Sequence, residues 1–239
     1  MSELEPVDYT HGGKRLTGLL AKPATPAIGA VIVFPTIVNA NSAMEKRARM
    51  LAELGYLAMV ADFYGEPVKS FAAAGPLADA LRADPVFYRA RLAAGIKALR
   101  GHRAANGLSL AALGYCMGGG AALEAARDGQ DLVAAVSFHG LLTTQTPAQP
   151  GDITGRILVL HGDADPMVPR SQVAAFQEEM DKAGADWHFH SYSGVRHGFT
   201  DPASDERDLE AVSYDASADR QSWAAMQCFL QETFEAAAA

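Results

Sequence analysis

The sequence predicts an α/β fold, with a mostly parallel central sheet and helices on both faces. Short apolar runs of strand length alternate with longer runs of helical periodicity along the whole chain. Several of the short runs are continuously apolar, as in strands buried on both faces. Neither an internal repeat nor a composition-biased linker divides the 239 residues. We therefore expect a single domain over residues 1–239.

The expected strands begin with a hairpin at the edge of the sheet. Residues 7–10 and 16–21 flank the turn sequence HGG and are expected to pair antiparallel. GAVIVFP at 29–35 is a continuous apolar run of buried-strand length, and YLAMVAD at 56–62 is the next. Four further strands are expected at residues 108–115, 132–140, 156–162 and 186–192.

The expected helices lie between these strands. Residues 43–54 combine helical periodicity with good helix formers, and the other helices are expected at about 71–82, 85–100, 117–128, 171–184 and 217–235. Residues 65–84 and 143–154 contain several prolines and glycines and are the least regular intervals. Lids, functional loops and surface connections share this composition, so the sequence leaves open whether 65–84 is a lid.

Composition and charge exclude several kinds of partner. The 28 acidic and 20 basic side chains give a net charge of -8, which disfavours nucleic acid. The acidic N-terminus does not resemble a secretory signal, and the longest apolar run, 27–38, is short of the roughly 20 residues that span a bilayer. We expect a cytoplasmic protein, a monomer or weak homodimer, with no membrane partner. Cys116 and Cys228 form no CxxC pair and are expected to be reduced thiols.

The segment GYCMGGG at 114–120 is the first candidate for chemistry. It lies between an expected strand and an alanine-rich expected helix, with Gly114 and Gly118 two residues before and after Cys116. A nucleophile elbow requires this strand, turn and helix, with small residues at those two positions. The helix N-terminus also favours a thiolate over a thiol. A cysteine buried for packing is the alternative, whereas the spacing does not fit GxGxxG or a phosphate loop.

Acid and histidine candidates follow in the order that such a nucleophile requires. HGDADPMVP at 161–169 places Asp163 and Asp165 after one expected strand, and SGVRHGF at 193–199 places His197 after the last. Nucleophile, acid and histidine is the chain order of α/β-hydrolases, in which histidine transfers protons and the acid fixes its tautomer. Either aspartate could be the acid, because a turn aspartate can instead bind loop backbone.

The chain resembles the dienelactone hydrolase family, α/β-hydrolases with a Cys-His-Asp triad. The resemblance extends through GAVIVFP, ELGYLAMVADFYGE, GYCMGGG, GDADPMVP and RHGF. It implies that Cys116 is the nucleophile, His197 the base and Asp165 the acid. It also implies an oxyanion hole formed by the backbone N–H groups of Met117 and Ile37.

Two positions differ from the pattern that this resemblance implies. Thr36 stands where family members carry a glutamate placed to interact with the thiol, and a threonine cannot supply its charge. The arginine expected shortly after the histidine is missing, which weakens the case for an anionic dienelactone substrate. Arg82 lies in the region of another family arginine, with solvated helix surface as its alternative role. Thr36, Arg82, Tyr64 and Phe199 are the expected substrate contacts, although loop packing would also account for the two aromatic residues.

The sequence thus predicts a hydrolase of small carboxylic esters or lactones that acts through a thioester at Cys116. No cofactor is expected. His188 and His190 alternate on one strand, but no third ligand is apparent, so edge-of-sheet packing is expected and no metal site. Thr36 keeps one alternative open, in which the same scaffold binds a small molecule without turnover or carries a redox-sensitive thiol.

Overall fold

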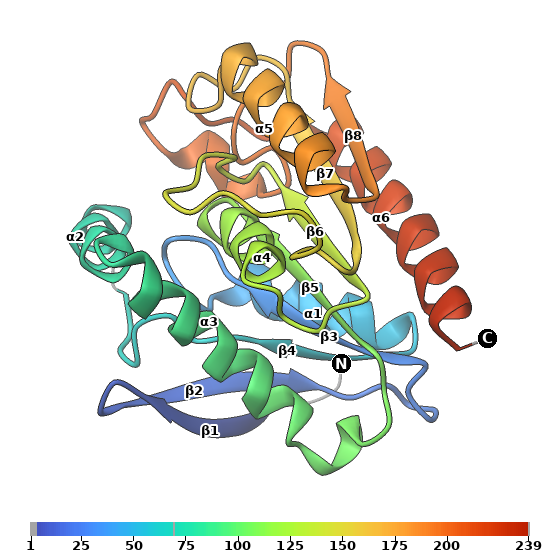
Figure 1. The fold of residues 1–239 in the computed structure, drawn as a ribbon. Coiled ribbons are helices and arrows are strands. Elements are labelled where there is room, and N and C mark those ends of the chain that lie inside the picture. Colours follow the sequence, from blue (N-terminus) through green and yellow to red (C-terminus); the bar gives the residue numbers. More distant parts are fainter. Residues whose placement is uncertain (1–3, 69, 239) are drawn as a thin grey trace.

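The centre of the protein is one eight-stranded sheet, seen in a computed structural model that describes residues 4–68 and 70–238 (Figure 1). The strands are β1 (Glu5–His11), β2 (Lys14–Ala21), β3 (Gly29–Phe34), β4 (Tyr56–Val60), β5 (Leu110–Tyr115), β6 (Ala134–Phe138), β7 (Arg156–Gly162) and β8 (Trp187–Tyr192). Their order is β1-β2-β4-β3-β5-β6-β7-β8. The strands β3 to β8 run parallel, and the β1–β2 hairpin joins β4 antiparallel. The predicted fold class, including the edge hairpin, is confirmed.

Two predicted strands end two residues earlier than expected. Residues 132–140 were expected as one strand, but β6 covers only Ala134–Phe138. His139 leaves the ladder because its φ is 39°, in the left-handed region. The strand expected at residues 56–62 likewise ends at Val60. Beyond it, the Asp62 carboxylate accepts hydrogen bonds from the N–H groups of Tyr64 and Gly65.

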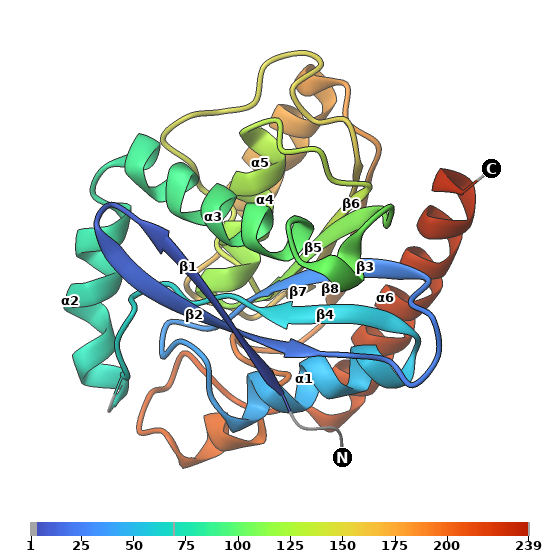
Figure 2. The ribbon, with the colours of Figure 1, turned by 90° about the horizontal axis from the view of Figure 1, so that it is seen from below.

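Helices cover both faces of the sheet (Figures 1 and 2). The helices are α1 (Ser42–Glu53), α2 (Phe71–Arg82), α3 (Pro85–Arg100), α4 (Met117–Arg127), α5 (Arg170–Ala183) and α6 (Ala216–Ala237), with short 3-10 helices η1 (Arg103–Ala105) and η2 (Pro202–Glu206). Apolar side chains of α1 and α6 pack on one face, and those of α3, α4 and α5 pack on the other. Each predicted helix is therefore present, while residues 143–154 contain neither helix nor strand.

Side-chain caps explain where three of these helices begin. Asn41 accepts the Met44 N–H at the start of α1, Asp84 accepts two N–H groups of α3, and Asp215 does the same for α6. In the described part of the chain, no helix has the length and apolar character needed to cross a membrane. The remaining helix of interest, α4, begins without a side-chain cap, and the residue at its N-cap position is Cys116.

Candidate active site

Cys116 occupies a strained turn at the carboxyl end of the central strand β5. It is the single residue between β5 and α4, with φ 56° and ψ -120°. A non-glycine residue in this region is strained and persists only where the surroundings fix it. Its N–H is fixed by two acceptors, the Phe138 carbonyl at 3.0 Å and His139 Nδ1 at 3.1 Å. The thiol is thus presented at the edge where the parallel strands end.

Close backbone packing explains the two glycines that flank this turn. A Cβ added at Gly114 would lie 1.9 Å from the Gly118 carbonyl oxygen, and one added at Gly118 would lie 2.0 Å from the Phe34 carbonyl oxygen. Neither space admits even a methyl group. The GxCxG spacing therefore lets α4 start directly against β3 and β5, which places Cys116 beside the loop that follows β3.

His197 and Asp165 meet beside Cys116 although they come from separate loops. Asp165 follows β7, His197 follows β8, and His197 Nδ1–H donates to Asp165 Oδ2 at 2.7 Å. Both residues are 3% exposed. Because the carboxylate holds the Nδ1 proton, the Nε2 side of the ring remains for Cys116, and Nε2 has no hydrogen-bond partner among the described residues.

Asp163, the other candidate acid, lies away from His197. Its carboxylate binds the Arg170 guanidinium at 3.0 and 2.7 Å on the protein surface. Asp165 instead accepts the Met167 N–H at 2.8 Å, which fixes its second oxygen. The structure therefore brings Asp165, and not Asp163, to the histidine.

The charges of the pair favour a thiolate and an imidazolium. Burial acts to raise the pKa of the Cys116 thiol, but the neighbouring His197 charge and the N–H groups of Met117 and Ile37 outweigh it and lower that pKa. Burial acts to lower the pKa of His197, but the Cys116 charge and Asp165 outweigh it and raise that pKa. The same two backbone N–H groups that were expected as an oxyanion hole thus face the sulfur.

The loop that carries Ile37 is held by a buried pair that the sequence analysis did not single out. Asn39, with φ 65°, donates through Nδ2 to Asp62 Oδ1 at 2.8 Å and accepts the Phe63 N–H at 3.0 Å. Asp62 Oδ2 also accepts the Thr17 N–H at 3.0 Å. The signal available in the sequence was an aspartate directly after a buried strand. This pair fixes the backbone that presents the Ile37 N–H.

Two of the expected substrate contacts, Thr36 and Tyr64, belong to or touch the loop that carries Ile37. The Thr36 hydroxyl is buried and has no hydrogen-bond partner among the described residues. The Tyr64 hydroxyl donates to the Ile37 carbonyl at 3.0 Å and contacts Met117 Sδ at 3.6 Å. Tyr64 therefore supports the Ile37 loop, while the Thr36 hydroxyl has an unused hydrogen-bonding capacity.

Phe199, another expected substrate contact, is buried. It is 0% exposed and packs against the rings of His139 and Tyr192, with centroids 5.1 and 5.7 Å away. This burial fits loop packing, which was the alternative role for Phe199. Its contacts with His139 and Tyr192 hold the loop that carries His197.

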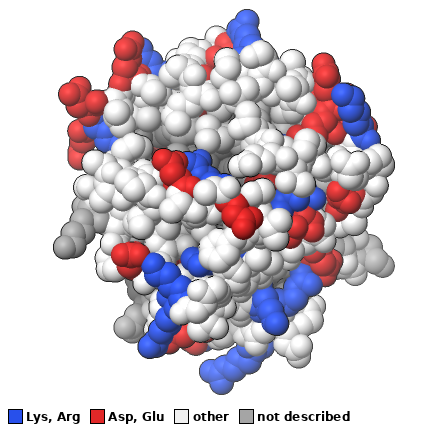
Figure 3. All heavy atoms as spheres, turned by 60° about the vertical axis from the view of Figure 1, so that its left-hand side comes forward, with Lys and Arg blue, Asp and Glu red and all other residues white. Residues whose placement is uncertain are grey.

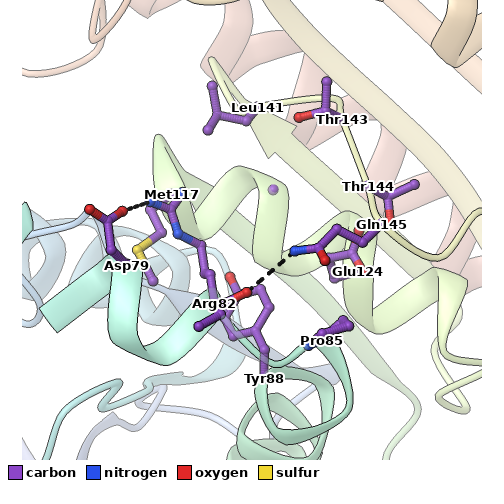
Figure 4. Close-up of a pocket in the computed structure, with 12 residues that line it drawn as sticks. Asp79, Arg82, Pro85, Tyr88, Met117, Glu124, Leu141, Thr143, Thr144 and Gln145 are labelled. Atoms are coloured by element: carbon purple, nitrogen blue, oxygen red, sulfur yellow. Dashed lines mark hydrogen bonds and ion pairs between the residues drawn. The ribbon is translucent and has the colours of Figure 1, made fainter. Parts of the chain in front are cut away.

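Arg82 lines a cavity of about 390 Å³ that Met117 also borders (Figure 4). The cavity lies between the end of α2, the start of α3, α4 and residues 141–145. The guanidinium pairs with Asp79 at 3.1 Å and donates to the Ala78 carbonyl. Acidic and basic side chains both surround the hollowed surface on this side of the molecule (Figure 3).

In the described ranges, no group of three or more His, Cys, Asp or Glu side chains is arranged so that it could hold a metal ion. His188 and His190 are exposed on β8, which is an edge strand of the sheet. Cys228 is exposed on α6. The chemistry-bearing side chains that converge are thus Cys116, His197 and Asp165.

Comparisons with known proteins bear on the family of this chain. A model of the dienelactone hydrolase family matches residues 16–234. A Bradyrhizobium sp protein described as a probable 2-oxo-3-(5-oxofuran-2-ylidene)propanoate lactonase is 32% identical over 202 residues, 80% of this chain and 81% of that protein. An uncharacterized Caenorhabditis elegans protein is 41% identical over 147 residues, 60% of this chain and 92% of that one. The solved structure of a dienelactone hydrolase-like promiscuous phosphotriesterase, P91 from metagenomic libraries, has a TM-score of 0.90 and 33% identity and covers 96% of this chain and 98% of its own.

Proposed function

Because this chain belongs to the dienelactone hydrolase family and is a hydrolase acting on ester bonds, we propose that it cleaves small carboxylic esters or lactones through a thioester at Cys116. The observation that supports this proposal most is the convergence at Cys116. One sulfur is faced by His197 and by the backbone N–H groups of Met117 and Ile37. These are the groups that a nucleophile, a proton carrier and an oxyanion require at one point.

In the first half of the reaction the Cys116 thiolate attacks the substrate carbonyl carbon. The developing oxyanion accepts hydrogen bonds from the N–H groups of Met117 and Ile37. As the intermediate collapses, the carbon–oxygen bond to the leaving group breaks, and the alkoxide takes the Nε2 proton of His197. The product of this half is a thioester on Cys116, with the imidazole neutral and still held by Asp165 through Nδ1.

In the second half His197 Nε2 removes a proton from water, and the hydroxide attacks the thioester carbon. The same two N–H groups stabilise the second oxyanion, and the thiolate leaves as the acid product forms. The imidazolium–thiolate pair is thereby restored.

Thr36 supplies no carboxylate to hold the thiol, so His197 and the two N–H groups carry that stabilisation. We propose that the free Thr36 hydroxyl donates to a substrate oxygen.

We propose that the cavity bordered by Met117, the residue next to Cys116, receives the substrate, so that its charge balance bears on the substrate class. Arg82 is paired with Asp79, and Glu124 in the same lining is paired with Arg89 and Arg127. A substrate carboxylate would have to compete with Asp79 for the Arg82 guanidinium. We therefore propose neutral substrates with good leaving groups, such as strained or enol lactones, because a thiolate expels a poor alkoxide slowly.

A panel of matched substrates tests this proposal. Purified protein is assayed with neutral enol lactones, the same lactones bearing a carboxylate, and short-chain p-nitrophenyl esters. A phosphotriester is also tested, because one solved relative is described as a promiscuous phosphotriesterase. We expect measurable kcat/KM for the neutral activated substrates and lower values for their carboxylate-bearing counterparts. Product formation from none of them would contradict the proposal and favour binding or redox sensing without turnover.

The two aspartates of the acid loop give a matched pair of variants. Asp165→Asn is expected to lower kcat/KM about 100-fold or more, because the amide no longer holds the His197 Nδ1 proton or balances the imidazolium charge. Asp163→Asn removes only a surface ion pair with Arg170 and is expected to keep activity within about twofold. Steady-state kinetics on one activated ester measures both. Equal losses in the two variants would contradict the assignment of Asp165.

A further inference from the structure

His139, at the end of β6, contacts three parts of the candidate site at once. Its Nδ1 accepts the Cys116 N–H at 3.1 Å, and its Nε2 lies 2.9 Å from Thr200 Oγ1. Its ring packs edge-on against His197, with centroids 5.2 Å apart. His139 is 2% exposed and has a strained φ of 39°. A buried, strained residue that touches a nucleophile's backbone and its base is not explained by packing alone.

The hydrogen bonds determine the tautomer of this ring. Because Cys116 N–H can only donate, His139 Nδ1 must be the acceptor, so the ring proton lies on Nε2 and is donated to the Thr200 hydroxyl. A doubly protonated His139 would lose its contact to Cys116. Burial, followed by the charge of His197 and by those of Arg47 and Arg207, lowers the pKa of His139 well below its ordinary value. The ring therefore stays neutral while His197 carries the proton.

Thr200 connects this ring to a second buried charge. The Thr200 carbonyl accepts Arg47 Nη2 at 2.8 Å, and the same guanidinium nitrogen pairs with Asp219 at 2.5 Å. Arg47 belongs to α1 and Asp219 to α6, so the residue that holds His139 is anchored to helices on the opposite face from α4. The chain of contacts runs from Asp219 through Arg47 and Thr200 to His139 and ends at Cys116.

We propose that His139 is a positioning residue, which holds the Cys116 turn against the His197 loop as a neutral, Nε2-protonated imidazole. This inference rests on the proposed function, because it assigns His139 to the alignment of that nucleophile and base. His139 takes no proton from the substrate. Its removal lets the turn relax, so that Cys116 Sγ no longer faces His197 and the two N–H groups together. A misplacement on the order of 1 Å costs about 100-fold in such a site.

Variants that keep one half of the ring's contacts test the proposal. Asparagine at this position keeps an acceptor where Nδ1 lies, whereas phenylalanine keeps the ring and loses both contacts. We expect His139→Phe to lower kcat about 10- to 100-fold with KM unchanged, and His139→Asn to recover most of that loss, within about fivefold of the parent. Thr200→Val, which frees Nε2 but keeps a β-branched shape, is expected to lie between them.

Alkylation of Cys116 by iodoacetamide across pH supplies a readout that needs no substrate. The parent is expected to react with a midpoint below about 8.5, the ordinary thiol value, and His139→Phe with a midpoint shifted back toward it. His190→Phe is the control, an exposed histidine on the edge strand β8. Its midpoint is expected to equal that of the parent.

Two results would overturn the proposal. One is that the His139→Phe protein keeps the parent's kcat and alkylation midpoint. If that variant does not fold, the same result for the Thr200→Val protein counts instead. The other is a loss in His139→Asn as large as in His139→Phe, since the Nδ1 acceptor would then be irrelevant. If the parent hydrolyses no ester, the proposed function fails by itself, and the alkylation midpoints still decide the role of His139.

Discussion

Cys116→Ala is expected to lower kcat/KM for an activated ester by about 1,000-fold or more, with the fold intact. The substitution removes the sulfur that attacks the carbonyl, while the oxyanion N–H groups and His197 remain in place. Steady-state kinetics measures the loss, and circular dichroism and thermal unfolding establish that the variant is folded.

The second cysteine supplies the control for this experiment. Cys228→Ala removes an exposed thiol on α6 and is expected to retain full activity. A Cys116→Ala protein with the parent's activity would show that some other group attacks the substrate. Both proteins are assayed freshly reduced, because oxidation of Cys116 in the parent would lower its activity and make the two proteins look alike.

Gly118→Ala is expected to destabilise the protein by about 3 kcal/mol or more, the largest effect on stability that we predict. The added methyl would lie 2.0 Å from the Phe34 carbonyl oxygen and 2.4 Å from that of Pro35, and both are backbone atoms that cannot rotate away. Because the clash lies between the start of α4 and the end of β3, any movement of α4 that relieves it would also displace the Cys116 turn. Denaturant-induced unfolding measures the change in free energy of unfolding.

Gly75→Ala is the matched control for that substitution. Gly75 lies in α2, and a Cβ there would meet nothing within 4 Å. Alanine is the better helix former, but the ring of Pro76 opposes a Cβ on the helical residue before it, so this variant is expected to stay within about 1 kcal/mol of the parent. A Gly118→Ala protein that unfolds at the same denaturant concentration as the parent would contradict the close packing at the elbow.

Local patterns in the sequence were sufficient to predict the sheet and the thiol. The elbow is defined by a buried strand, two glycines and a helix within one short segment, so Cys116 could be placed from neighbouring residues alone. The strands could be predicted because a parallel sheet covered on both faces requires continuous apolar runs. The end of β6 could not be predicted, because that boundary depends on the left-handed φ of His139.

The contacts that align the site are long-range, and residue patterns do not encode them visibly. Asn39 and Asp62 are 23 residues apart, and His139 and Thr200 are 61 apart. Asp163 and Asp165 share one loop and one residue type, so residue patterns alone left both as candidates. The loop's path directs Asp165 to His197 and leaves Asp163 with Arg170.

The central claim, that Cys116 carries the acyl group during turnover, is tested most directly by trapping that intermediate. The protein is mixed with a p-nitrophenyl ester, quenched in acid during turnover, and its intact and peptide masses are measured. We predict the mass of one acyl group, located on the peptide that contains Cys116, released by neutral hydroxylamine and absent from Cys116→Ala. An acyl group on another residue, or rapid hydrolysis by an enzyme in which Cys116 is fully alkylated, would contradict the account.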